Sequence, residues 1–229
     1  MPKRHPFDVY LEVGQKRVFA GALEWPGWCR GGRDEAGALG ALADSAPRYA
    51  KLLATAGLDF APPKAADMEV TERLGGNSTT EFGAPDIAPA ADARPIDADE
   101  LARFQALLRA YWGALDAAIG AATGRKLRSG PRGGGRDLAS IMRHVGEAEA
   151  GYLGRVAWKR EYPASDDPAA DLARSHQSVL DALEAAVRDG LPERGPRGGA
   201  IWLPRYFVRR VGWHALDHAW EIEDRLIEA

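Results

Sequence analysis

Hydrophobic and polar residues alternate near the start of the chain, in a period-two pattern that predicts β-strands. Residues 7–13 alternate apolar and charged side chains, and after a Gly-Gln turn residues 17–25 continue as a second strand of a hairpin. A Pro-Gly pair then ends the hairpin. The other elements predicted in this part are a helix over 34–56, with Asp34 as its N-cap, and a strand over 68–74. Residues 1–84 are therefore predicted to form a small α+β module.

The pattern changes after residue 84. Residues 85–97 are rich in Pro, Ala and Asp and lack periodicity, so we interpret them as a linker. Beyond them, apolar residues recur at spacings of three and four, which is typical of amphipathic helices. Four such helices with one apolar stripe each predict an all-α four-helix bundle over 98–229. The predicted helices span 98–122, 136–159, 167–189 and 204–227.

Two histidines on the last predicted helix are the strongest indication of chemistry. His214 and His218 are four residues apart in W-H-A-L-D-H-A-W, so both imidazoles leave one face of the helix. His144, on the second predicted helix, also borders an apolar stripe. Three neutral imidazoles from two helices suit a divalent ion that keeps open positions for water, and such an ion lowers the pKa of a bound water or thiol. The alternative is that each histidine is a hydrogen-bonded core residue.

Other side chains near these stripes have a structural and a functional interpretation. His176 is also predicted to face inward, which makes it a competing ligand. Carboxylates spaced three residues from a candidate ligand can orient an imidazole N–H or pair with a nearby arginine. The arginines that precede His214 and His218 are either charges on the helix surface or form a basic entrance for an anionic substrate. The tryptophans either pack in the bundle or line a pocket. The candidates around the site are Glu147, Asp217, Glu221, Arg209, Arg210 and Trp213.

Composition narrows the classes of function. The chain has 229 residues, a formal net charge of −3 and a single cysteine, Cys29. The acidic balance argues against nucleic-acid binding, and one cysteine excludes an internal disulfide. The basic N-terminus has no apolar run behind it, and no stretch is long and apolar enough to span a bilayer. We therefore expect a cytoplasmic protein that binds no membrane.

Two segments together resemble the DinB-like superfamily. They are R-D-L-A-S-I-M-R-H-V-G-E-A-E-A-G-Y-L at 136–153 and R-R-V-G-W-H-A-L-D-H-A-W-E-I-E-D-R at 209–225. The resemblance covers about 97–229 and implies an up-down-down-up four-helix bundle. It also implies a divalent-metal site at His144, His214 and His218. Many members are thiol-dependent S-transferases, maleylpyruvate isomerase-like proteins among them, and others have no known activity.

The N-terminal part is similar to the HicB-like antitoxin fold, on fewer residues. Residues 17–39 contain a strand ending in Pro26-Gly27, followed by a helix that opens with Glu35-Ala36. The stretch between the two is shorter than usual in that fold. HicB-like units are commonly small binding modules without catalysis, and the resemblance implies no toxin partner.

These observations lead to two hypotheses. In the first, Zn²⁺ or Ni²⁺, with Fe²⁺ and Mn²⁺ as alternatives, is held by the three histidines. The ion activates a low-molecular-weight thiol or water for transfer to, or hydrolysis of, a small electrophile. In the second, the chain is a non-catalytic metal-binding or partner-binding stress or regulatory protein. The expected partners are a small-molecule substrate and a second copy of the chain in a homodimer.

Overall fold

The computed structural model describes residues 7–129, 135–159, 165–195 and 199–227. The chain divides into two compact units between Arg94 and Pro95. The first unit carries a sheet and the second is helical, so the α+β class predicted from the sequence is confirmed.

The first unit is built on a four-stranded sheet with the order β3-β2-β1-β4. Strands β1 (Phe7–Val13) and β2 (Val18–Ala22) form the expected antiparallel hairpin, and β4 (Met68–Gly75) lies parallel to β1. Strand β3 (Cys29–Gly32) pairs with β2 and was not predicted, because its Gly-Gly end is untypical of a strand. The remaining elements are α1 (Glu35–Thr55), η1 (Ala65–Asp67), α2 (Ser78–Phe82) and η2 (Ala90–Ala93).

Helix α1 packs against β2 and β3 through an aromatic cluster. Asp34 is its N-cap, as expected, and accepts the N–H of Gly37 at 2.7 Å. Trp28 stacks on Tyr49 with ring centroids 4.8 Å apart, and Phe60 packs edge-on against both rings. The indole N–H of Trp28 donates to Ser45 at 2.9 Å. The core of this unit is thus filled by side chains in mutual contact.

Much of the segment interpreted as a linker belongs to the first unit. Glu12 of β1 is fully buried, and its carboxylate accepts the backbone N–H groups of Asp86 and Ile87 at 2.8 and 2.9 Å, together with the hydroxyl of Thr80. Burial raises the pKa of Glu12, whereas these donors lower it. The N–H of Ala90 donates to Glu72 of β4 at 2.9 Å. These bonds satisfy backbone groups that a solvated linker would leave to water.

The described residues of the second unit include four long helices near the predicted positions. They are α3 (Ala98–Ala122), α4 (Leu138–Arg155), α5 (Pro168–Arg188) and α6 (Pro204–Arg225). Aspartates cap the first three: the side chains of Asp97, Asp137 and Asp167 accept N–H groups of the first turn. Helix α6 starts with Pro204 at its first position, where a missing N–H costs nothing.

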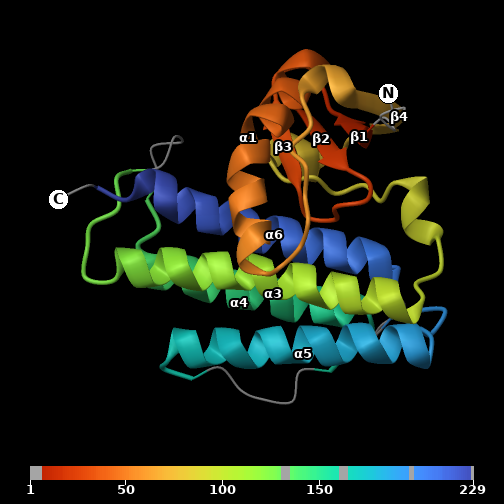
Figure 1. The fold of residues 1–229 in the computed structure, drawn as a ribbon. Coiled ribbons are helices and arrows are strands. Elements are labelled where there is room, and N and C mark those ends of the chain that lie inside the picture. The colour runs from red at the N-terminus through yellow and green to blue at the C-terminus, as the bar shows by residue number, and fades with distance from the viewer. Residues whose placement is uncertain (1–6, 130–134, 160–164, 196–198, 228–229) are drawn as a thin grey trace. The chain divides into compact units, whose positions relative to one another are not determined.

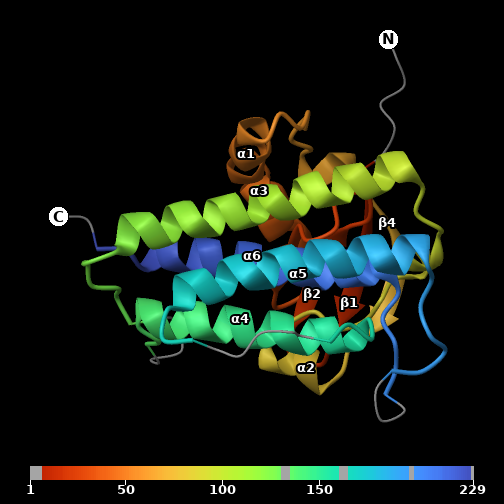
Figure 2. The ribbon, with the colours of Figure 1, turned by 90° about the horizontal axis from the view of Figure 1, so that it is seen from below.

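The four helices lie alongside one another (Figure 1, Figure 2), and α6 packs against α3, α4 and α5. Every residue of α6 from Arg205 to Leu216 is buried, whereas α3 and α5 each include exposed residues. Within the part of the chain that the structure describes, no helix has the length and apolarity needed to cross a bilayer. The buried polar side chains of α6 each need a partner.

Candidate metal centre

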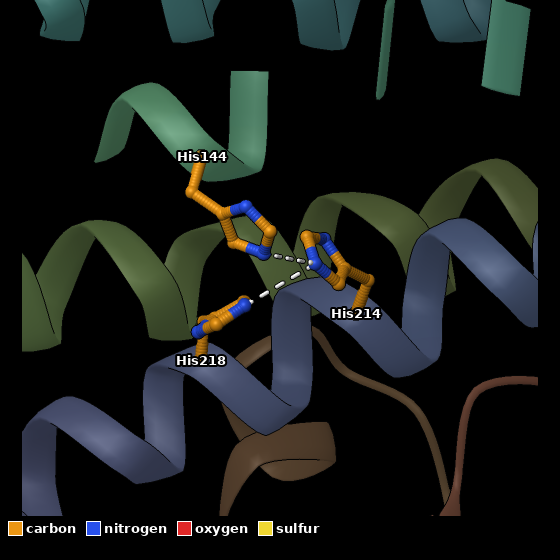
Figure 3. A group of neighbouring side chains, drawn as sticks. All are labelled: His144, His214 and His218. Atoms are coloured by element: carbon orange, nitrogen blue, oxygen red, sulfur yellow. Dashed lines mark hydrogen bonds between the residues drawn. The ribbon is translucent and has the colours of Figure 1, made fainter. Parts of the chain in front are cut away.

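Three imidazoles meet between α4 and α6 (Figure 3). We call His144, His214 and His218 the histidine triad. The Nε2 atom of His214 lies 3.3 Å from Nε2 of His144 and 3.2 Å from Nε2 of His218. One ligand atom from each residue lies within 4.8 Å of the others. His214 and His218 are adjacent on α6 because they are one helical turn apart, and α4 brings His144 to them.

The two distances from Nε2 of His214 fit a shared ion. A tetrahedral site with metal–nitrogen bonds of about 2.0–2.1 Å places its ligand nitrogens about 3.3 Å apart. Hydrogen bonds among the imidazoles alone satisfy these nitrogens less well than an ion would. If one of the three Nε2 atoms carries a proton, the other two still present lone pairs to one another. The donor set, three nitrogen atoms of intermediate softness, suits Zn²⁺ and Ni²⁺.

A chain of hydrogen bonds holds His218 in a defined orientation. Its Nδ1 donates to Glu221 at 2.7 Å, and the other carboxylate oxygen of Glu221 accepts from Arg225 at 2.6 Å. Arg225 in turn donates to the backbone carbonyls of Arg128 and Arg136 at 2.8 and 2.9 Å. The hydrogen bond from His218 is the main reason that the pKa of Glu221 falls to about 2. With its proton held at Nδ1, His218 presents the Nε2 lone pair to the centre of the triad.

Burial keeps the other two imidazoles neutral. It lowers the pKa of His214 well below 6.5 and also lowers that of half-buried His144, and the positive charge of Arg136 adds to both shifts. Nδ1 of His214 is buried without a hydrogen-bond partner. His214 is therefore oriented by its ring contacts, with Tyr152 at 5.8 Å and Trp213 at 6.2 Å between ring centroids.

An arginine lies beside the triad. The guanidinium of Arg210 lies 5.6 Å above the ring of Tyr152 and 5.2 Å above that of Trp213, and it contacts the Tyr152 hydroxyl at 3.5 Å. Its positive charge contributes to the lowered pKa of His214. Arg210 is buried, so its charge is less screened by water than that of a surface arginine.

The other side chains predicted around the site differ in their placement. Glu221 is hydrogen-bonded to His218, and Asp217 is half-buried on α6. Glu147 is exposed and acts on His144 only through its charge, which raises the pKa of that imidazole. Arg209 and Trp213 are buried in α6.

His176, the competing ligand, lies outside the triad. It stacks on Trp112 with ring centroids 4.3 Å apart, and its Nε2 is 3.6 Å from the carboxylate of Glu149. Sequence reasoning missed Glu149, which is 1% exposed. The missed signal is a four-residue spacing along α4, since the buried residues of this helix are Ile141, Val145, Glu149 and Leu153. The apolar stripe predicted from the sequence instead continued through Ala148 and Tyr152, which are only partly buried.

Comparison of the chain with protein-family models, with curated proteins and with solved structures found no match.

Proposed function

We propose that the second unit is a DinB-like four-helix bundle, with up-down-down-up topology, that binds a divalent metal ion at the histidine triad. The ion is Zn²⁺ or Ni²⁺, and the protein acts with a low-molecular-weight thiol or water on a small electrophile. The observation that carries the proposal is the position of Nε2 of His214, 3.3 Å from Nε2 of His144 and 3.2 Å from Nε2 of His218.

The position of the two motifs and the hydrogen bonding of His218 support this function. The two motifs that resemble the DinB-like superfamily lie on α4 and α6, which are the helices that supply the triad. The hydrogen bond between His218 and Glu221 is the kind of support that metal-ligating histidines commonly have. A histidine held only for packing needs no such orientation of its Nε2 toward two other imidazoles.

A bound divalent ion supplies Lewis acidity, which makes a thiol or water nucleophilic at neutral pH. The protein's own residues have distinct roles around it. Glu221 fixes the tautomer of His218, and the lowered pKa values of His144 and His214 keep their lone pairs free of protons. Arg210 contributes a buried positive charge beside His214, which favours an anionic group such as a thiolate or a substrate carboxylate.

We propose for the first unit a role as a binding module of HicB-like type, through which the chain pairs with a second copy or with another protein. Its support is the order of a strand, a Pro-Gly turn and a helix beginning at Glu35.

Elemental analysis of the purified protein tests the metal site. We expect close to one equivalent of Zn or Ni per chain in the wild type and a large loss in His214→Ala. His176→Gln is the matched control, because this histidine belongs to the same unit but lies outside the triad. Equal metal content in the wild type and His214→Ala would contradict the proposed site.

Turnover is tested separately, with the metal-loaded protein, several low-molecular-weight thiols and a panel of small electrophiles. We expect consumption of thiol that depends on the metal and disappears in His214→Ala. If the metal is bound but no thiol is consumed and no electrophile is hydrolysed, while a stable macromolecular partner is captured, the non-catalytic hypothesis is favoured.

A further inference from the structure

A second group of polar side chains is buried where α3, α4 and α5 meet. Glu149 on α4 accepts the indole N–H of Trp112 on α3 at 3.0 Å. His176 on α5 stacks on the same indole, and its Nε2 lies 3.6 Å from Oε1 of Glu149. The hydroxyl of Ser175, also on α5, is buried beside them. These contacts are separate from those of the histidine triad.

A negative charge on Glu149 and a positive charge on His176 would be poorly compensated. The carboxyl of Glu149 is 1% exposed and its Oε2 has no hydrogen-bond partner, nor does Nε2 of His176. A buried carboxylate normally requires several donors, and a buried imidazolium requires an acceptor at hydrogen-bond distance. At 3.6 Å the pair is too long for a charge-assisted hydrogen bond, which is about 2.7–2.9 Å. The geometry thus favours two neutral groups over an ion pair.

We propose that Glu149 and His176 form a neutral pair in the folded protein, with the proton on the carboxyl group and the imidazole unprotonated. In the unfolded chain near pH 5.5, most of the Glu149 carboxyls are ionised and most of the His176 imidazoles are protonated. Folding therefore moves one proton from the imidazole to the carboxyl with no net exchange with solvent. The pair is a polar contact between α4 and α5 that contributes almost no pH dependence of its own to stability.

The titration of the two groups agrees with this state. Burial raises the pKa of Glu149 from 4.5 to about 7 and lowers the pKa of His176 from 6.5 to about 4. From α3, the charge of Asp116 also raises the pKa of Glu149, while the hydrogen bond from the indole N–H of Trp112 lowers it. Among the described residues, no charged group of α6 contributes to either shift. Between pH 4.5 and 6.5 the folded and unfolded chains bind the same number of protons at this pair, because the two shifts are opposite and of similar size.

Spectroscopy of the folded protein distinguishes the neutral pair from an ion pair. In ¹⁵N-histidine NMR at pH 5.5, we expect the imidazole of His176 to be neutral, and His176→Gln assigns its signals. The infrared spectrum at the same pH should contain the C=O band of a protonated carboxyl that is lost in Glu149→Gln. A protonated His176 at pH 5.5, or a wild-type spectrum without that band, would overturn the proposal.

Unfolding by urea at several pH values tests the compensation. Relative to the wild type, Glu149→Gln should lose stability as the pH falls from 6.5 to about 4, because its unfolded chain protonates His176 and its folded chain does not. His176→Gln should lose stability as the pH rises from 4.5 to about 7, because its unfolded chain ionises Glu149 first. Each change should reach about tenfold in the unfolding constant per pH unit. The double variant should follow the wild-type pH dependence, and parallel curves for all four proteins would refute the pairing.

Discussion

The orientation of His218 by Glu221 gives the most demanding prediction about the triad. Replacing Glu221 by Gln keeps the size of the side chain but removes the negative charge that faces both His218 and Arg225. The amide can still accept the Nδ1 proton through its oxygen, so the imidazole keeps its tautomer but becomes a weaker base. Loss of such a supporting carboxylate commonly lowers metal affinity about tenfold to hundredfold, which corresponds to about 1.4–2.7 kcal/mol.

The charge network also contributes to the stability of the metal-free protein. Glu221 has a folded pKa of about 2 against 4.5 in the unfolded chain, which corresponds to an upper value of about 3 kcal/mol. Because its side chain is 31% exposed, solvent screening reduces this contribution to about 1–2 kcal/mol. The pKa is depressed, so the contribution is fully present above pH 4.5 and is lost as the pH falls toward 2.

Competition between the protein and a chromophoric chelator at pH 7 measures the affinity for Zn²⁺. Glu147→Gln is the matched control, because Glu147 lies three residues after His144 but is exposed and not hydrogen-bonded to the triad. We expect its affinity to stay within about twofold of the wild type. Equal affinities for Glu221→Gln and the wild type would refute the reasoning that the hydrogen bond to Glu221 supports a metal ligand.

Three further predictions concern stability. Saturating Zn²⁺ should raise the free energy of unfolding of the wild type by about 2.7 kcal/mol at a concentration a hundredfold above the dissociation constant, and a chelator should reverse the gain; His214→Ala should not respond to either in calorimetry. Asp137→Ala removes the acceptor for the N–H of Ser140 at the start of α4 and should cost about 1 kcal/mol in urea unfolding. Glu12→Gln should speed amide hydrogen exchange at Asp86 and Ile87 about tenfold, because the neutral amide cannot accept all the bonds that the carboxylate accepts.

The long helices were predictable because their apolar residues repeat over many turns and Asp or Pro marks their starts. The predicted bounds of α3 agree with the structure, and those of α6 differ only at its end. The short elements were missed for a local reason. Strand β3 is four residues long and ends in Gly-Gly, and the segment before Pro95 is ordered by Glu12 and Glu72, which lie far away in the sequence.

The candidate site likewise includes residues that the sequence places and others that only the tertiary structure places. His214 and His218 are one turn apart on one helix, so the sequence alone places them together, and His144 was found from its position beside an apolar stripe. The pairing of Glu149 with His176 depends on the packing of α4 against α5, and the four-residue spacing that contains Glu149 competes with the stripe through Ala148 and Tyr152. Tertiary packing decides which of several stripes faces inward when their apolar content is similar.

Helix α4 carries a residue of each buried polar group, His144 of the histidine triad and Glu149 of the pair with His176. It buries only Ile141, Val145 and Leu153 among its apolar residues, fewer than α3 or α5, so apolar packing holds it less firmly. His144 and Glu149 are five residues apart, which places them roughly 140° apart around the helix. One contacts the histidines of α6, and the other contacts α3 and α5. If the triad binds a metal ion as proposed, loss of the ion should weaken the contact of α4 with α6 while the contacts of Glu149 with α3 and α5 remain.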